Sequence, residues 1–197
     1  MASQIVTIIL AAGRGSRFDP SGAHSKLLAK LPDGRAVIRA AAESCTRVDT
    51  RLVMVCGSRH RRQISDVLSG LDVQILTCPD ADAGMGATLK CGIACTQPSV
   101  GWIVMLGDMP YVRTSTIQAV ADGLLDRALL VRPYLDGRPG HPAGISKKLA
   151  TELLALPDEE GGASLFRKYA DQVQRIKSVD EGCMLDIDRP EDLREAP

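Results

Sequence analysis

Short apolar runs alternate with amphipathic segments through the first two-thirds of the chain. Runs rich in aliphatic and β-branched residues predict strands covered on both faces, at positions 5–10, 51–56, 73–77 and 102–106. Each run is followed by a segment with helical spacing or high alanine content, at positions 36–44, 59–69, 86–95 and 114–125. Four strand-then-helix units in succession predict an α/β fold with three layers and a mainly parallel sheet.

The last third of the chain has a less regular pattern. Positions 128–132 predict another strand, and positions 173–179 predict an edge strand because polar residues alternate through them. Positions 147–155 and 163–170 predict helices, whereas glycine and proline crowd positions 137–142 and predict turns. We expect this irregular C-terminal part to face the substrate.

Composition narrows the class of protein. The 197 residues include 24 Lys and Arg against 24 Asp and Glu, a formal net charge of zero, and 45% are hydrophobic. This apolar content is enough for a packed core and excludes disorder as the main state. The length is typical of one domain, which we expect to span residues 1–197. Zero net charge argues against nucleic-acid and membrane partners, and no apolar run reaches the roughly 18–20 residues of a membrane helix.

The six cysteines are scattered without a CxxC pair, which is not the pattern of a disulfide scaffold at this length. Cys91 and Cys95 share a helical face, so a zinc site is one interpretation of them. Two further ligands are missing, however, and packing in the core is favoured. These features predict a soluble, reduced, cytoplasmic protein.

A turn of small residues follows the first strand, with the sequence LAAGRGSRF at Leu10 to Phe18. Small side chains let the backbone approach a ligand closely, and consecutive N–H groups in such a turn bind anions. Arg17 and Lys26 add two positive charges. A Walker A loop is excluded because no GK[ST] occurs, and the dinucleotide fingerprint is excluded because Phe18 replaces its third glycine. Phosphate binding and a purely structural turn both stay open.

Acidic residues mark two distant segments. Asp108 ends an apolar strand, where it ligates a metal, caps the helix expected near position 114 or closes a turn before Pro110. Asp186 and Asp188 alternate along an extended segment, so their side chains face the same way and repel unless a cation lies near them. The other interpretation of this pair is a solvated loop before a short helix that begins at Pro190.

Two further segments have weaker signals. Gly84 to Leu89 opens a helix with flexible backbone, which suits either a nucleotide or a simple loop. His141 lies between glycine and proline, where it either contacts an anionic substrate or is an exposed turn residue.

These motifs in this order resemble the MobA-like nucleotidyltransferase family, and most closely its MocA-type molybdenum cofactor cytidylyltransferase branch. The resemblance rests on Lys26 and on five segments, LAAGRGSRF (10–18), AGMGATLKCGI (83–93), LGDMP (106–110), GHP (140–142) and DIDRPEDL (186–193). It implies a Rossmann-like nucleotidyltransferase fold, a Mg²⁺-dependent enzyme and a nucleoside triphosphate donor. Ala12, where guanylyl-transferring relatives have glycine, points to CTP, and the branch implies a molybdopterin-type acceptor whose terminal phosphate attacks CTP.

The resemblance also assigns roles to residues. It implies catalytic roles for Arg17, Lys26 and Asp108, with Lys26 neutralising the α-phosphate, and Mg²⁺ ligation by Asp108 with Asp186 or Asp188. His141 is assigned to the acceptor pocket. Nucleotide binding is expected at a larger set of small residues, namely Leu10, Ala11, Ala12, Gly13, Gly15, Ser16, Pro79, Gly84 and Gly86.

Two other functions stay open at the level of the sequence. One is nucleotidyl transfer to another phosphorylated acceptor, such as a sugar or alcohol phosphate. The other is a non-catalytic protein that binds the molybdenum cofactor and delivers it to a molybdoenzyme client.

Overall fold

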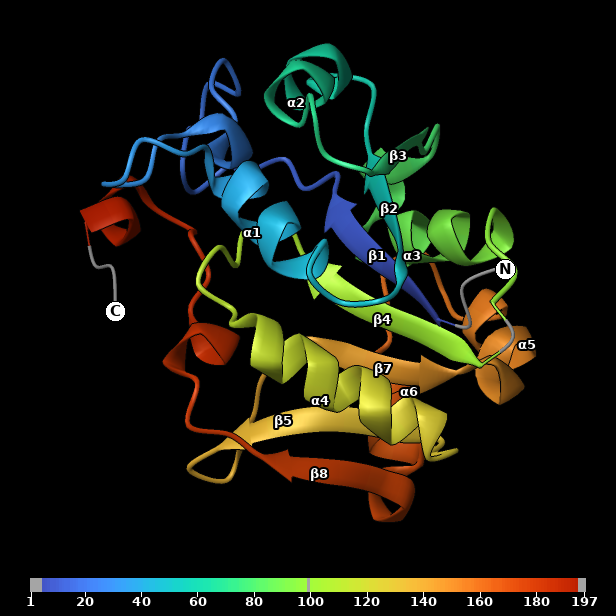
Figure 1. The fold of residues 1–197 in the computed structure, drawn as a ribbon. Coiled ribbons are helices and arrows are strands. Elements are labelled where there is room, and N and C mark those ends of the chain that lie inside the picture. Colours follow the sequence, from blue (N-terminus) through green and yellow to red (C-terminus); the bar gives the residue numbers. More distant parts are fainter. Residues whose placement is uncertain (1–4, 99, 195–197) are drawn as a thin grey trace.

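The computed structural model describes residues 5–98 and 100–194 of the 197-residue chain. An eight-stranded sheet crosses the molecule, with helices on both of its faces (Figure 1). The strands are β1 (Ile5–Ala11), β2 (Arg51–Cys56), β3 (Gln74–Thr77), β4 (Gly101–Leu106), β5 (Leu130–Leu135), β6 (Arg138–Pro139), β7 (Ala143–Ser146) and β8 (Val173–Lys177). The α-helices are α1 (Val37–Cys45), α2 (Arg61–Val67), α3 (Met85–Ala94), α4 (Thr114–Leu125), α5 (Ala150–Leu154) and α6 (Ala163–Lys168).

The sheet is mixed but mainly parallel, in the order β3-β2-β1-β4-β7-β5, with β6 and β8 both paired to β5. β1, β2, β3 and β4 are parallel to one another, and β5 and β8 are parallel to each other. β7 is antiparallel to both of its neighbours, β4 and β5. The three-layer α/β prediction is therefore confirmed, and β8 pairs at the edge as its alternating polar residues predict.

The sequence pattern missed β7. The strand has only four residues, Ala143 to Ser146, and directly follows a segment dense in turn residues. It is too short for a periodic signal to mark it. The predicted helix at 59–69 is also shorter in the structure. The segment predicted as one helix at 147–155 begins as a 3-10 helix at Lys147–Leu149 before α5.

Two hydrophobic cores lie on opposite faces of the sheet because side chains alternate along each strand. Ile5 and Ile9 of β1 point to one face, where α1, α2 and α4 pack against the sheet. Val6 and Ile8 point to the other face, which α3, α5 and α6 cover (Figure 1). β1 is buried along its whole length, which explains its continuous apolar sequence.

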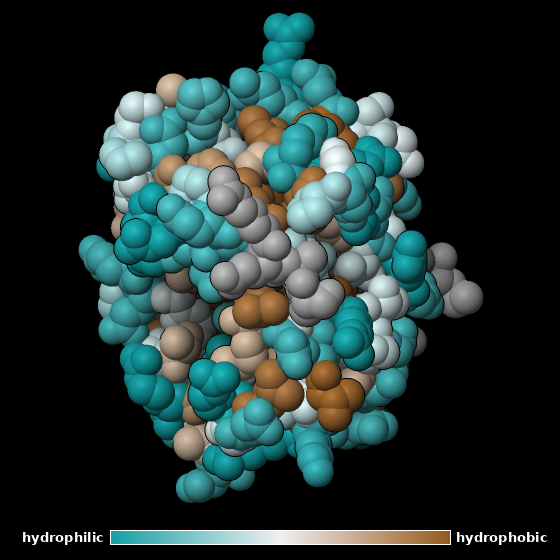
Figure 2. All heavy atoms as spheres, turned by 90° about the vertical axis from the view of Figure 1, so that its left-hand side faces the viewer, coloured by the Kyte–Doolittle hydropathy of each residue, from teal (hydrophilic) through white to brown (hydrophobic). Residues whose placement is uncertain are grey.

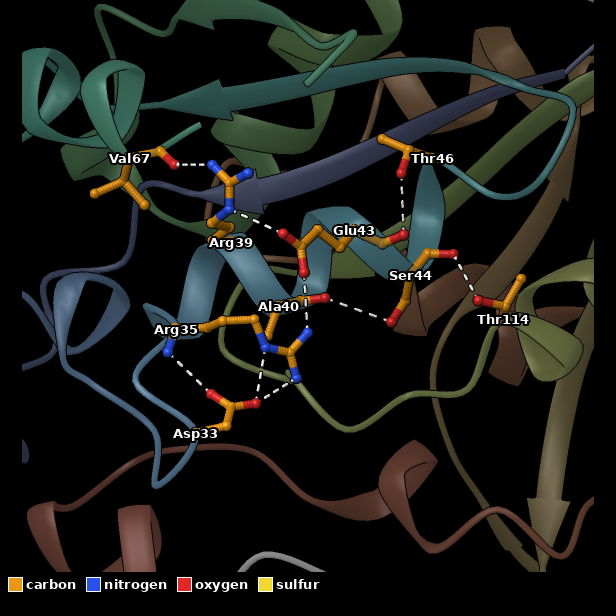
Figure 3. A network of polar contacts seen from close by, with 9 residues as sticks. All are labelled: Asp33, Arg35, Arg39, Ala40, Glu43, Ser44, Thr46, Val67 and Thr114. Carbon is orange, nitrogen blue, oxygen red and sulfur yellow. Dashed lines mark hydrogen bonds and ion pairs between the residues drawn. The ribbon is translucent and has the colours of Figure 1, made fainter. Parts of the chain in front are cut away.

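Polar contacts around α1 join the helix to neighbouring segments (Figure 3). The guanidinium of Arg35 donates to Asp33 and to Glu43, and Arg39 donates to the same Glu43 carboxylate at 2.8 Å. Arg39 also donates to the carbonyl of Val67 at 2.7 Å, at the end of α2. The hairpin before α1 and the end of α2 are thereby held against one helix.

A segment near the C-terminus, residues 180–188, passes the start of α4 and the loop that follows β4. We call this segment the C-terminal strap. Its anchor is Asp180, a buried carboxylate that is 3% exposed. Oδ2 of Asp180 accepts from the N–H of Arg113 at 2.9 Å and from the hydroxyl of Thr116 at 2.5 Å, and Oδ1 accepts from the N–H of Gly182 at 3.0 Å. The carboxylate thus accepts from the N–H of Arg113, the residue just before α4, and fixes the strap to the start of that helix.

We predict that Asp180→Asn destabilises the protein by about 2–4 kcal/mol, because an amide NH₂ would face donors that the carboxylate now satisfies. Chemical denaturation followed by circular dichroism measures the change. Asp122→Asn, an exposed position on α4, is the matched control and should change the free energy of unfolding little. Equal stabilities of the two variants would contradict the role of Asp180 as an anchor.

Candidate active site

The glycine-rich turn and the loop with Asp108 lie side by side because their strands are neighbours. β1 and β4 are parallel with Leu10 opposite Leu106, so the two following loops leave the same edge of the sheet. The N–H of Gly107 donates to the carbonyl of Leu10 at 2.9 Å. A Cβ at Gly107 would lie 3.0 Å from the carbonyl oxygen of Leu10, so glycine favours this close approach of the two loops.

Lys26 lies between two carboxylates. Its ammonium is 2.7 Å from Oδ2 of Asp108 and 2.8 Å from Oδ1 of Asp188, and its side chain is 10% exposed. Arg17 pairs with the other oxygen of Asp188. The stem of Lys26 runs along Gly15, which has a φ of +63° that favours glycine. Arg17, Lys26 and Asp108, predicted as catalytic, thus lie together.

The C-terminal strap brings the other two acids to Asp108. The N–H of Ile187 donates to the carbonyl of Asp108 at 2.8 Å, and the Ile187 side chain is buried beside α1. Because side chains alternate along an extended segment, Asp186 and Asp188 both face away from that core. Carboxylate oxygens of Asp108, Asp186 and Asp188 lie within 4.8 Å of one another.

Neither Asp108 nor Asp188 caps a helix. The capping interaction at α4 comes from Asp180, and no contact of Asp108 serves it. At the 3-10 helix Pro190–Arg194, Asp192 accepts from the N–H groups of Asp188 and Arg189 at 2.8 and 2.7 Å. The carboxylate of Asp188 is therefore available for cations.

The acidic cluster fits a divalent metal. Its ligands would be carboxylate oxygens, which Mg²⁺ and Mn²⁺ prefer. Oδ1 of Asp108 is buried and has no hydrogen-bond partner among the described residues. A buried carboxylate oxygen without a partner is costly, and a cation is one way to satisfy it. Within residues 5–98 and 100–194 no other group of three or more His, Cys, Asp or Glu has metal-binding geometry. Cys91 packs at the edge of a core, as favoured from sequence, whereas the same interpretation is wrong for Cys95, which is exposed.

A cleft extends from the acidic cluster along the ends of β1 and β4. Figure 2 views the molecule from the side where these strands end, and hydrophilic side chains predominate there. One part of the cleft has a volume of about 320 Å³, and adjoining parts extend it toward Pro79 and toward Lys26. Of the residues expected to bind nucleotide, those that line the cleft are Leu10, Ala11, Ala12, Gly13, Gly15, Ser16, Pro79 and Gly84.

Gly86 does not line this cleft. A Cβ there would collide with carbonyl oxygens of the segment 157–160, and the next N–H, that of Ala87, donates to the carbonyl of Asp158 at 3.1 Å. Lys90 reinforces this contact by donating to the carbonyl of Leu156 at 2.8 Å. The small size of Gly86 lets that segment pack against the first turn of α3, which is a structural role.

His141 is not the exposed turn residue of one interpretation. Its Nδ1 is buried, and Nε2 lies 3.4 Å from Nη2 of Arg132. Burial, followed by the positive charge of Arg132, lowers the pKa of His141 to about 4, while Asp108 and a backbone contact with Val104 oppose the shift. Since arginine only donates, Nε2 of the neutral ring accepts and the proton lies on Nδ1.

Sequence reasoning missed three contributors to the site. Arg14 donates to Asp82 at 3.0 Å, and both residues line the cleft. Met85, 54% exposed, lines the same cleft at the start of α3. Asp180 holds the C-terminal strap in place. Arg14 lies inside a motif that was recognised, whereas nothing in the local sequence separates Asp180 from an ordinary turn aspartate.

In this mainly parallel sheet, a glycine-rich turn follows β1 and a carboxylate follows the neighbouring strand β4. This arrangement is that of a nucleotidyltransferase-like α/β protein. The model of the MobA-like NTP transferase domain matches residues 7–173, and the chain belongs to this family.

Relatives agree with the family and the fold. The chain is 29% identical over 160 residues to the bifunctional protein GlmU of Burkholderia mallei, covering 77% of this chain and 34% of GlmU, so it spans about a third of that relative. The crystal structure of Rv0371c from Mycobacterium tuberculosis H37Rv superposes with a TM-score of 0.79 at 23% identity, covering 98% of this chain and 96% of Rv0371c. The crystal structure of molybdopterin-guanine dinucleotide biosynthesis protein A from Archaeoglobus fulgidus superposes with a TM-score of 0.68 at 18% identity. The match covers 95% of this chain and 94% of that protein.

Across the part of the chain that the structure describes, no helix combines the length and apolar character needed to span a membrane.

We predict that His141 makes stability depend on pH in acid. Its folded-state pKa of about 4 lies below the ordinary 6.5, so the unfolded chain binds a proton first as pH falls. The neutral ring contributes fully to the free energy of unfolding above pH 6.5. This contribution, roughly 3 kcal/mol, is lost as the pH falls from about 6.5 to 4. Denaturation across this range should show a shallower loss for His141→Gln. His24→Gln, with an 84% exposed side chain, should keep the wild-type slope, and identical slopes for all three would contradict the prediction.

Proposed function

We propose that the protein transfers CMP from CTP to the terminal phosphate of a molybdopterin-type cofactor and releases pyrophosphate. The observation that carries the proposal is the meeting of Lys26, Arg17 and three carboxylates at one end of a cleft lined by the glycine-rich turn. Opposite charges concentrated at one point suit a reaction that brings several phosphates together.

The reaction needs no protein nucleophile. An oxygen of the acceptor phosphate forms a bond to the α-phosphorus of CTP, the bond to the β-phosphate oxygen breaks, and pyrophosphate leaves with the electron pair. Backbone N–H groups of the turn from Gly13 to Arg17 hold the β- and γ-phosphates. Lys26 neutralises charge on the α-phosphate as the bond forms. Its ammonium orients the phosphate and stabilises the transition state, and it does not attack the phosphorus.

Three carboxylates complete this arrangement. Asp108, with Asp186 or Asp188, would hold Mg²⁺, which when bound supplies positive charge that screens the phosphates from one another. The C-terminal strap orients these carboxylates through the Ile187 hydrogen bond to Asp108. Rv0371c, whose fold is similar, has been crystallised as a complex with manganese, which supports a divalent ion here.

The two ends of the cleft suit two different ligands. Leu10, Ala11 and Ala12 present backbone to the base, and Pro79 and Gly84 also line this part of the cleft. Ala12 in place of glycine supports CTP through the resemblance to the cytidylyltransferase branch. His141 is our candidate for the acceptor pocket, because its ring lies beside Arg132 and interacts with the charge of Asp108, although it lines none of the parts of the cleft described above.

Nucleotide and acceptor are tested separately. Thermal unfolding with Mg²⁺ and each of CTP, GTP, ATP and UTP should give the largest shift with CTP, since a ligand that binds the folded state raises stability by mass action. Labelled CTP with molybdopterin, a sugar phosphate or an alcohol phosphate should release pyrophosphate only with molybdopterin. Release with another acceptor would replace that part of the proposal, and stoichiometric binding of the cofactor without release would indicate a delivery protein.

We predict that Asp108→Asn lowers the turnover number by at least about 100-fold while the protein stays folded, because it removes charge from the metal site and from Lys26. Pyrophosphate release at saturating CTP measures the loss, and circular dichroism checks the fold. Asp126→Asn, an exposed position at the end of α4, is the control. Near-wild-type turnover of Asp108→Asn would remove Asp108 from the active site.

A further inference from the structure

Lys26 occupies the space between two of the three carboxylates that would hold the metal. Its ammonium contacts Asp108 at 2.7 Å and Asp188 at 2.8 Å. An ammonium is a compact point charge with three donors, so it satisfies oxygens that would otherwise face a metal ion. These contacts use Oδ2 of Asp108 and leave Oδ1 buried and without a hydrogen-bond partner among the described residues.

Cations of the chain already balance most of the acidic charge here. Lys26 and Arg17 bring two positive charges to the three carboxylates, so the cluster carries a single net negative charge. A free divalent cation would gain little attraction from such a cluster and would be repelled by the ammonium within it. The low exposure of Lys26 limits the screening of that repulsion by water and salt.

We infer that Lys26 is the resident counter-ion of the acidic cluster and determines that a divalent metal enters only together with the triphosphate. This inference rests on the proposed function, because the triphosphate supplies the negative charge to which Lys26 transfers. The stem of Lys26 passes Gly15 in the anion-binding turn. Rotation of side-chain bonds alone therefore moves the ammonium from the carboxylates to a phosphate and opens the carboxylates to the metal.

The test measures binding of Mn²⁺ without nucleotide, by the loss of the electron paramagnetic resonance signal of free Mn²⁺. Lys26→Met keeps the length of the stem and removes the charge, and it should bind Mn²⁺ at least about tenfold more tightly than wild type. Lys26→Gln should gain affinity in the same way. Lys30→Met, the same change at an exposed lysine four residues on, should leave the affinity at the wild-type level.

Two further variants locate the effect. Lys26→Met combined with Asp108→Asn should lose the gain in affinity, because the metal site loses a carboxylate. Lys26→Arg, which keeps the positive charge, should bind Mn²⁺ as weakly as wild type. Mn²⁺ should also raise the melting temperature of Lys26→Met more than that of wild type, which checks that the folded state binds the ion.

Equal affinity of wild type, Lys26→Met and Lys26→Gln for Mn²⁺ alone would overturn the counter-ion role. So would a gain in Lys26→Met that persists when Asp108 is replaced. Failure of the proposed function has a different signature, namely no pyrophosphate release with any nucleotide and acceptor, and it would leave the Mn²⁺ comparison intact.

Discussion

Mutual repulsion of three neighbouring carboxylates is the constraint around which this structure is organised. Acids whose oxygens lie within 4.8 Å of one another would move apart unless positive charge and rigid backbone hold them. Lys26 supplies the charge from the N-terminal part of the chain, and the Ile187–Asp108 hydrogen bond supplies the backbone restraint from the C-terminal part. The three carboxylates are thereby held in place by groups of the chain itself.

The scaffold resists this repulsion through contacts that lie away from the cleft. Asp180 holds the C-terminal strap to the start of α4, and Gly182 allows the strap to pass close to the backbone of Tyr111. On the other side, the polar contacts of α1 restrain the hairpin that follows Lys26 (Figure 3). Substitutions at these positions would change the geometry of the site without touching any group inside it.

Much of the fold was predictable because parallel strands buried on both faces have continuous apolar sequences. β1, β2 and β4 carry that signal, and the parallel pairing of β1 with β4 places Leu10 beside Leu106. β7 has no such signal, since four residues directly after a turn acquire their conformation only from pairing with β4 and β5. Asp108, Lys26 and Asp188 were found as separate motifs, but the anchoring role of Asp180 and the packing role of Gly86 arise from tertiary contacts that no local pattern encodes.

The ion pair between Lys26 and Asp188 joins residues 162 positions apart in the sequence. Contacts of such long range close late in folding, after the entropy of a large loop has been overcome. During synthesis on the ribosome, the sheet strands β1 to β4 emerge well before residues 180–188. A nascent chain can thus form much of its cores while the acidic cluster is still incomplete, and the cluster forms only once residues 186–188 have emerged.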